Sequence, residues 1–328
     1  MFINKLKLSV FIFGTYFTGN ALGAWKMGGD ISCHDPTIIQ ESDRWYAFCT
    51  GEGIQVLTTE NGGDTWVRAP QVFLNKPSWW GSTVPGQAGL DVWAPDLEVF
   101  NGRTYLFYSI STFGKQNSAI GLASAASIGA GSWKDEGVVL TSKEGDGYNA
   151  IDPNLVIDQS GKPWLAFGSF WTGLKIVALN PSTMRPTGDI YSIAARSSSS
   201  AIEAPSITYH DGYYYLFASI DKCCSGVAST YKIVVSRSKN INGPYVDKDG
   251  MTISFYLTAS SDSNCFFYYI RIFKGGSLFD TGNERWIGPG GEDVSGSVIA
   301  RHAYDAEDNG TSKLLVSPLR WSNGWPTY

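Results

Sequence analysis

Four short phrases, each with a proline beside an acid and then an apolar run, recur along the chain. They are CHDPTII (33–39), WAPDLEVF (93–100), AIDPNLVI (150–157) and AIEAPSIT (201–208). Their prolines, at 36, 95, 153 and 205, are separated by 59, 58 and 52 residues. A phrase that returns at a period of tens of residues indicates an array of structural repeats, so this pattern constrains the fold strongly.

Each phrase is followed by a turn and then by an aromatic strand. The predicted strands are RWYAFCT (44–50), RTYLFYS (103–109), KPWLAFGS (162–169) and YYYLFAS (213–219). Turns such as NGR and HDG lie between phrase and strand, and these are typical of β-hairpins. Further strands such as SAIGLASA (118–125) complete each unit. Four-stranded units at this period predict propeller blades.

A fifth unit, 285–317, is visible but distorted, since its Pro289 lies 84 residues after Pro205. We therefore expect an all-β chain that forms one five-bladed β-propeller over residues 24–328. A β-sandwich or two all-β domains are the alternatives, but no linker-like stretch divides the chain. The 37 glycines and the 14% of aromatic residues fit short strands joined by tight turns.

Residues 1–23 are predicted to be a signal peptide. Lys5 and Lys7 precede an apolar run from Leu8 to Phe17, and small residues follow it. A membrane anchor is the alternative, but the run is short for a bilayer. We expect a secreted, extracellular protein with no membrane partner. Asn309, in the triplet NGT, is then a candidate for glycosylation.

The chain has five cysteines, an odd number for an oxidising compartment. Cys33 and Cys49 lie at either end of one predicted strand–turn–strand stretch and are candidates for a disulfide. The adjacent Cys223 and Cys224 can bond to each other or pair elsewhere. Cys265 is left over.

The charge and the motifs exclude several functions. A net charge of −5 argues against a nucleic-acid partner, because nucleic-acid-binding domains usually carry a basic patch. The chain has no GxSxG motif, and only His34, His210 and His302 are available as a histidine base. A serine or cysteine nucleophile is therefore not indicated.

The acids of the repeated phrases are the candidate catalytic groups. The innermost strand of a propeller blade faces a central channel, so Asp35, Asp96, Asp152 and Glu203 are expected to approach one axis. Like charges raise the pKa of at least one neighbour. A protonated acid beside an ionised base is the arrangement that glycoside hydrolysis uses.

Aromatic residues near the phrases can stack on sugar rings. The candidates are Trp79, Trp80, Trp93, Phe113, Phe170 and Trp171. Packing in the core or between blades is the expected role of at least half of them.

Several motifs in order resemble the endo-1,5-α-L-arabinanases of glycoside hydrolase family 43. They are HDPTII, DVWAPDLE, STFGKQNSAIGLA, NAIDPNLVID with GKPWLAFGSFW, IEAPSI and ARHAYDA. The likeness runs from about residue 30 to the C-terminus, apart from one segment. It implies a five-bladed propeller and an inverting mechanism. By motif, Asp35 matches the general base, Glu203 the general acid, and Asp152 the carboxylate that raises the pKa of the acid and orients it.

An inverting acid and base are expected about 6.5–9.5 Å apart, which leaves room for a water. The resemblance gives Asp96 no catalytic role, so a structural salt bridge or a turn hydrogen bond is expected. His34 is expected to support a catalytic group or contact substrate.

The resemblance also implies binding residues. Gly114, Asn149, Ser169 and Phe170 match substrate-contacting positions, together with Asp35 and Asp152, although Gly114 can simply permit a turn. His302 matches a histidine associated with a structural metal, commonly calcium, in the central channel. A lone histidine that only makes hydrogen bonds is the alternative. No cofactor is expected to be required for the chemistry.

The segment at about 251–274, MTISFYLTASSDSNCFFYYIRIFK, departs from the family pattern. It contains Cys265 and coincides with the long spacing before the fifth unit. An inserted hairpin is one interpretation. An artefact of gene prediction, such as a translated intron, is the interpretation that we favour.

The sequence thus predicts a monomeric enzyme that makes endo cuts in α-1,5-linked L-arabinan, a pectin side chain, with linear arabinan as its partner. The alternatives are an exo-acting arabinofuranosidase or β-xylosidase on the same scaffold, or a catalytically inactive carbohydrate-binding propeller. A retaining fructan-cleaving enzyme would open with a phrase like WMNDPNG, which is absent.

Overall fold

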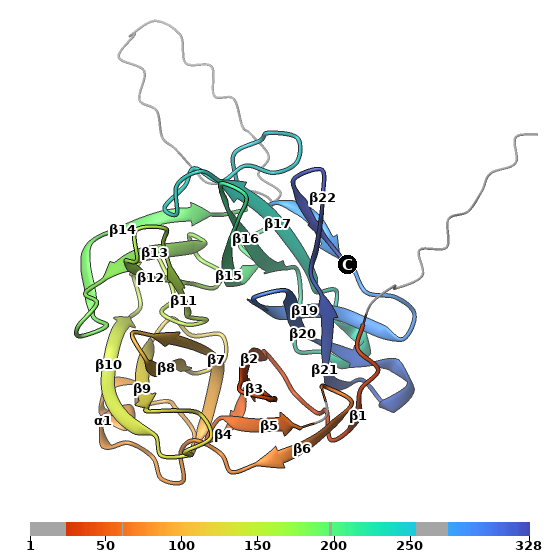
Figure 1. The fold of residues 1–328 in the computed structure, drawn as a ribbon. Coiled ribbons are helices and arrows are strands. Elements are labelled where there is room, and N and C mark those ends of the chain that lie inside the picture. The colour runs from red at the N-terminus through yellow and green to blue at the C-terminus, as the bar shows by residue number, and fades with distance from the viewer. Residues whose placement is uncertain (1–23, 61, 197–198, 254–274) are drawn as a thin grey trace, which may run out of the picture.

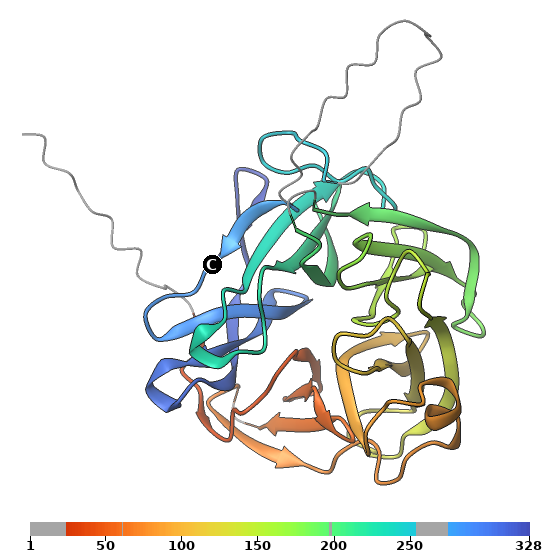
Figure 2. The same cartoon turned by 180° about the vertical axis from the view of Figure 1, so that it is seen from behind.

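Five antiparallel sheets surround a central channel in the computed structural model of the chain (Figures 1 and 2), which describes residues 24–60, 62–196, 199–253 and 275–328. The arrangement confirms the predicted all-β five-bladed propeller. Among the described residues, no helix is long and apolar enough to cross a membrane. The predicted signal peptide, 1–23, lies outside the described residues.

The blades follow one another along the chain, each beginning at the axis. Blade 1 contains β2 (Thr37–Glu41), β3 (Arg44–Cys49), β5 (Gln55–Thr59) and β6 (Thr65–Ala69). Blade 2 contains β7 (Asp91–Phe100), β8 (Arg103–Ile110), β9 (Ser118–Ala125) and β10 (Lys134–Ser142). Blade 3 contains β11 (Asn154–Ile157), β12 (Pro163–Phe167), β13 (Leu174–Leu179) and β14 (Pro186–Ala194). Blade 4 contains β15 (Ile202–His210), β16 (Tyr213–Ile220), β17 (Lys232–Ser238) and β18 (Ser277–Asp280). Blade 5 contains β19 (Trp286–Ser295), β20 (Val298–Asp305) and β21 (Thr311–Pro318).

The remaining elements are short. They are β1 (Gly28–Gly29), β4 (Gly51–Glu52), α1 (Ser78–Thr83), the 3₁₀ turns η1 (Gly226–Ala228) and η2 (Ala306–Asp308), and the hairpin of β22 (Arg320–Ser322) and β23 (Trp325–Thr327).

The predicted hairpins form because their turn residues suit them. Asn101 and Gly102, between β7 and β8, have φ of 51° and 73°. Asp211 and Gly212, between β15 and β16, have φ of 43° and 82°. Two successive positive φ angles give a turn whose twist matches that of the flanking strands. Each first strand therefore folds directly back on the second.

The second strands bury one large side chain each between blades. Phe48, Phe107, Phe167 and Phe217, from four blades, are at most 1% exposed. Each buried phenylalanine stabilises the fold by about 1.5–3 kcal/mol. This explains the repeated aromatic strand in the sequence.

The N-terminal segment closes the ring of blades. It runs beside β21, where the amide of Trp25 donates to Val316 O at 2.8 Å and the amide of Leu314 donates to Ile31 O at 2.7 Å. The two ends of this segment thus bond to blade 5, whereas its middle, β1, pairs in parallel with β6 of blade 1. The segment therefore joins the last blade to the first. The C-terminal hairpin instead lies against blade 4, where Tyr215 Oη donates to Gly324 O.

The anomalous segment begins inside the fold. Ile253 is 1% exposed in a core cluster, and its carbonyl accepts from the amide of Ala195 at 2.8 Å. The segment was expected to begin at about residue 251, but residues 251–253 still belong to the packed structure. Residues 254–274, with Cys265, lie outside the described residues, in the connection between β17 and β18.

Candidate active site

Each blade has one residue in the left-handed conformation just before or within its innermost strand. These residues are Asp35, Ala94, Asp152, Ala204 and Gly291, with φ of 45°, 38°, 54°, 51° and 56°. All five line one pocket on the axis. Positive φ is uncommon outside glycine, and strained residues of this kind cluster at functional sites.

This register corrects the sequence alignment of the acids. Asp35 and Asp152 occupy the left-handed position, whereas Glu203 precedes it and Asp96 comes two residues after it. In the first four blades a proline directly follows the left-handed residue. In blade 5 the residue that follows Gly291 is Glu292, so Pro289 is not equivalent to the other prolines. The four acids therefore lie at three different positions of the repeat.

The residue after the proline position ties each blade to the next. The side chain at this position accepts a hydrogen bond from a backbone amide of the next blade. The five pairs are Leu97 N to Thr37 (3.1 Å), Leu155 N to Asp96 (2.6 Å), Ile207 N to Asn154 (2.9 Å), Val294 N to Ser206 (3.2 Å) and Ile38 N to Asp293 (2.9 Å). These five bonds form a closed ring around the axis. Asp96 is one of its acceptors, so it makes an inter-blade hydrogen bond and no salt bridge to a described residue. Asp96 lines the same pocket as Asp35 and Asp152, but its two carboxyl oxygens accept from Asn154 and Leu155 of the next blade.

A second set of hydrogen bonds holds four of the five left-handed residues by their amides. The second strands end in Thr50, Ser109 and Ser219, whose hydroxyls accept from the amides of Ala94, Asp152 and Gly291 at 2.8, 3.0 and 2.9 Å. In blade 5 this place is taken by His302, whose Nδ1 accepts from the amide of Asp35 at 3.1 Å. The sequence analysis missed this set, although each aromatic strand visibly ends in serine or threonine.

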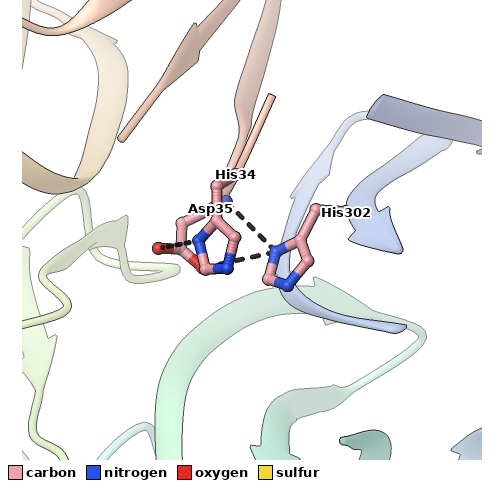
Figure 3. Close-up of side chains that lie close together, drawn as sticks. All are labelled: His34, Asp35 and His302. Atoms are coloured by element: carbon pink, nitrogen blue, oxygen red, sulfur yellow. Dashed lines mark hydrogen bonds and ion pairs between the residues drawn. The ribbon is translucent and has the colours of Figure 1, made fainter. Parts of the chain in front are cut away.

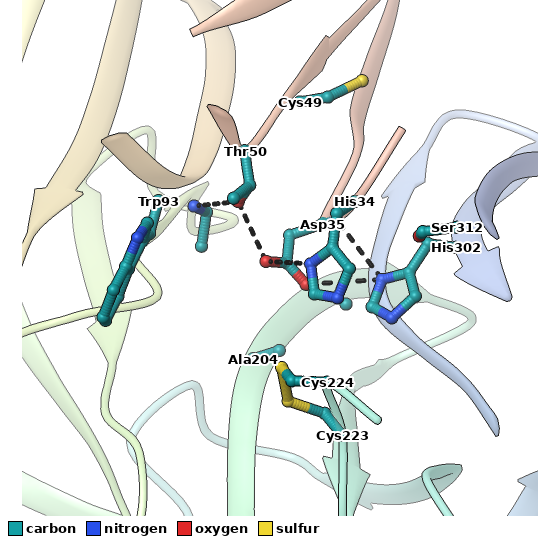
Figure 4. Close-up of polar contacts among 12 residues, drawn as sticks. His34, Asp35, Cys49, Thr50, Trp93, Ala204, Cys223, Cys224, His302 and Ser312 are labelled. Atoms are coloured by element: carbon teal, nitrogen blue, oxygen red, sulfur yellow. Dashed lines mark hydrogen bonds and ion pairs between the residues drawn. A yellow bond between two sulfur atoms is a disulfide. The ribbon is translucent and has the colours of Figure 1, made fainter. Parts of the chain in front are cut away.

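Asp35 is held as a carboxylate. His34 Nδ1 and Thr50 Oγ1 donate to its Oδ2 at 2.8 and 2.9 Å, and His302 Nδ1 lies 3.3 Å from its Oδ1 (Figures 3 and 4). Burial favours the neutral acid, but the two histidines outweigh it and hold the pKa of Asp35 well below its usual range. An ionised carboxylate in this position can accept a proton from water.

Asp152 and Glu203 show the opposite behaviour. Burial, followed by the negative charge of Glu203, raises the pKa of Asp152 well above its usual value. Burial also raises the pKa of Glu203, despite hydrogen bonds from Ser169 and Tyr231. The amide of Ala204 donates to Asp152 Oδ2 at 3.1 Å, which links the pair through the chain. This pair therefore retains a proton at pH values where Asp35 is ionised.

The predicted substrate residues take different places. Ser169 is buried and donates to Glu203 Oε2 at 2.7 Å, so it supports the candidate acid. Asn149 is buried, and its Oδ1 accepts from Ser118 and Ser142. Gly114 is exposed in the β8–β9 loop with φ of 72°. Phe170 is 38% exposed in the β12–β13 loop.

The candidate aromatic residues divide between core and surface. Trp80 is fully buried, and Trp79 packs against the same cluster. Trp93, half-buried on β7, is drawn with the acid site in Figure 4. Phe113 and Trp171 are 77% and 40% exposed on loops that follow second strands. Only the residues outside the core are available to a sugar chain.

His302 fits a single-nitrogen contact to a metal. Its ring is fully buried, and its Nε2 has no partner in the described structure. Burial lowers the pKa of His302 to about 4, which leaves a neutral imidazole with one N–H. Metal binding at Nε2 requires the tautomer in which Nδ1 carries that proton and faces Asp35 Oδ1, 3.3 Å away, instead of accepting from the amide of Asp35. Glu292 Oε1, from the adjacent strand, is a second buried atom without a described partner, but burial raises the pKa of Glu292 to about 8, which favours the neutral acid. The remaining ligands would have to be water.

The cysteines pair locally. The structure joins Cys33 to Cys49, and of the two arrangements considered for Cys223 and Cys224 it has the bond between neighbours (Figure 4). The amide of Cys224 donates to Tyr304 Oη, which lies 2.9 Å from His34 Nε2. The vicinal disulfide is thus linked to the histidine that holds Asp35.

The predicted glycosylation site is accessible. Asn309 is exposed and ends the η2 turn in the left-handed conformation.

Comparisons with known proteins identify the family of the chain. The model of glycosyl hydrolases family 43 matches residues 30–326. The extracellular endo-α-(1→5)-L-arabinanase 1 of Bacillus subtilis is 50% identical over 90% of this chain and 87% of its own length. The extracellular exo-α-(1→5)-L-arabinofuranosidase ArbA of Cellvibrio japonicus is 37% identical over 90% and 86%. The solved structure of the family 43 endo-arabinanase from Bacillus licheniformis has 50% identity and a TM-score of 0.85, and the match covers 93% of this chain and all of that one. The chain belongs to glycoside hydrolase family 43.

Proposed function

We propose that this protein is an endo-1,5-α-L-arabinanase that hydrolyses linear arabinan with inversion. The observation that carries the proposal is the difference in pKa among three channel carboxyls. The pKa of Asp35 is lowered, and those of Asp152 and Glu203 are raised. An inverting glycosidase needs an ionised base and a protonated acid at the same pH. The greater identity to the endo-acting relative than to the exo-acting one supports the endo assignment.

In the proposed mechanism Asp35 takes a proton from a water, and the water attacks the anomeric carbon. Glu203 gives its proton to the departing sugar oxygen as the glycosidic bond breaks. Burial raises the pKa of Glu203, and the ionised forms of Asp152 and Glu203 repel each other. Asp152 also fixes the chain next to Glu203 through the amide of Ala204. Phe170 and Gly114, on exposed loops, are available to contact the arabinan chain.

Calcium is proposed as a structural ion held by His302 Nε2 and water. When bound, it would supply positive charge close to the channel carboxylates. We further propose that the protein is exported, because the names of two relatives describe them as extracellular. It would act as a monomer on polysaccharide, without a nucleic-acid or membrane partner.

The test is incubation with linear and branched arabinan, with sizing of the products and NMR of the released anomer. Early oligosaccharides of mixed length with inverted configuration are expected. Monomer alone from the outset would favour the exo-acting alternative, and no hydrolysis would favour a carbohydrate-binding propeller. Retained configuration would remove the inverting mechanism.

Two substitutions test the roles of the acids. Asp35→Ala and Glu203→Ala should each reduce turnover by at least about a hundredfold, since general acid–base catalysis contributes about 10²–10⁴. Glu98→Gln, at the other end of the channel, is the matched control and should keep full activity. Near-normal turnover in either alanine variant would remove that residue from its role.

A further inference from the structure

Both carboxyl oxygens of Glu203 are held by hydroxyl groups. Ser169 Oγ donates to Oε2 at 2.7 Å, and Tyr231 Oη donates to Oε1 at 2.8 Å. Tyr231 precedes β17, is only 3% exposed and lies 28 residues from Glu203 in the sequence. Burial raises the pKa of Tyr231 well above its usual value, so its hydroxyl stays a neutral donor.

The ring of Tyr231 ends a stack of three rings. It lies against His302 with centroids 6.0 Å apart and planes at 26°. His302 lies on His34 with centroids 3.8 Å apart and planes at 23°, as Figure 3 shows. At one end of the stack His34 binds Asp35, and at the other Tyr231 binds Glu203. The rings come from blades 4, 5 and 1, so they bridge three blades.

Glycine leaves the space for this stack. A Cβ on Gly290 would overlap the Tyr231 ring, and one on Gly288 would come within 2.8 Å of Ser229 Cβ. Gly290 does not need positive φ, since its backbone is not in the left-handed region. The absence of a side chain at Gly290 therefore leaves room for the ring of Tyr231.

We propose that Tyr231 is a positioning residue for the general acid. Its hydroxyl orients Glu203, and its ring, stacked through His302 on His34, sets the spacing between acid and base. The proposal rests on the proposed function, in which Glu203 and Asp35 have those roles. An inverting enzyme must keep its two carboxyls far enough apart for a water, and a stack of rigid rings between blades supplies such a spacer.

The test uses two substrates that differ in their need for an acid. Cleavage of arabinan requires a proton on the departing sugar oxygen. In a dinitrophenyl arabino-oligosaccharide the leaving group is dinitrophenolate, which departs with the bond electrons as a stable anion and needs no proton. Tyr231→Phe keeps the ring and removes the hydroxyl. On linear arabinan its kcat should fall about tenfold or more with little change in KM. On the dinitrophenyl substrate its kcat should stay close to that of the unmodified enzyme.

Two further variants complete the experiment. Gly290→Ala retains every functional group but displaces the ring, so it should show the same substrate-dependent loss. Tyr245→Phe is the matched control, because this buried hydroxyl donates to Ile241 O outside the channel. It should leave both rates unchanged.

The outcomes separate this proposal from the proposed function. Glu203→Ala is measured beside the other variants and should lose arabinan turnover far more than dinitrophenyl turnover. If it does so while Tyr231→Phe is normal on both substrates, the positioning role is overturned alone. Equal losses of Tyr231→Phe on both substrates would also overturn it, since a general structural defect does not depend on the leaving group. Full arabinan turnover by Glu203→Ala would overturn the acid assignment itself.

Discussion

The three channel carboxyls differ through their immediate partners. Asp35 faces two histidines, whereas Asp152 faces the carboxyl of Glu203 and receives a hydrogen bond from one backbone amide. All three are partly buried in the channel, so desolvation alone would raise every pKa. The placement of His34 and His302 beside only one of them therefore decides which carboxyl is the base.

Asp152→Asn tests the influence of one carboxyl on another. Asp152 and Glu203 repel each other when both are ionised. A neutral amide at position 152 removes that repulsion, so Glu203 should lose its proton at lower pH. The basic limb of the kcat/KM profile should then move to lower pH, and kcat should fall about a hundredfold. The pH–rate profile on linear arabinan measures both. An unmoved basic limb would contradict the tuning role, and Asp189→Asn on the exposed β14 provides the control.

The roles of single residues could be predicted only in part. The acids Asp35, Asp152 and Glu203 stood out because they recur near prolines, and the structure brings them close enough for their charges to interact. Tyr231 could not be found, since its contact with Glu203 depends on how the third strand of blade 4 packs. Asn149 and Ser169 matched family positions, but a sequence motif does not tell which oxygen or nitrogen already has a partner.

At the scale of elements, the inner strands act as one unit because each is tied to the next. The repeated phrase predicted the strands and the hairpins, since proline, turn residues and alternating burial are local signals. It did not reveal that Asp96 and Asn154 belong to a ring of inter-blade bonds. That ring depends on a register between blades, which local signals do not specify.

Asn154→Ala should break the ring. Its Oδ1 accepts from the amide of Ile207, and its Nδ2 donates to Asp96 Oδ1 at 3.0 Å. Two buried groups would lose their partner, which should lower the free energy of unfolding by about 2–4 kcal/mol. Urea denaturation measures this, with the exposed Asn117→Ala as control at about 0.5 kcal/mol or less. Equal effects of the two substitutions would rule out a special role for the ring.

Glu98 lies farther along β7, where the channel holds further acids. Burial raises the pKa of Glu98 from 4.5 to about 7. Between these pH values the folded protein keeps a proton that the unfolded chain has lost, so stability falls as pH rises through this range. Glu98→Gln removes the effect.

The variant Glu98→Gln should therefore match the unmodified protein below pH 4.5 and exceed its stability by about 1 kcal/mol above pH 7, a value reduced for partial exposure. Denaturant titrations at an acidic and a neutral pH measure the difference. A constant difference at both pH values would show that the substitution acts through packing and not through ionisation.

At the scale of the whole molecule, the ring of blades is completed by residues distant in sequence. Segment 25–33 bonds to blade 5 at its two ends and pairs with β6 of blade 1 in its middle, so it joins the last blade to the first. The disulfide Cys33–Cys49 then fastens this segment to the second strand of blade 1. The sequence suggested that bond from proximity, but its relation to ring closure depends on the tertiary fold.

The two disulfides should contribute very differently to stability. Cys33–Cys49 spans 16 residues, and a loop of that length restricts the unfolded chain by about 3 kcal/mol. Cys223 and Cys224 are neighbours, so their bond closes no comparable loop. Guanidinium denaturation should show a loss of about 3 kcal/mol for the Cys33→Ser, Cys49→Ser double variant. The matched Cys223→Ser, Cys224→Ser variant should lose much less.

Hydrogen exchange locates the consequence of removing Cys33–Cys49. Without the bond, segment 25–33 should open more often, so the amide of Leu314, which donates to Ile31 O, should exchange faster. The amide of Leu155, in the inner ring, should be protected as before, because opening of one outer strand leaves the inter-blade bonds in place. Faster exchange at both amides would mean that the segment and the inner ring unfold together, and the disulfide would then stabilise the propeller as a whole rather than its closing strand.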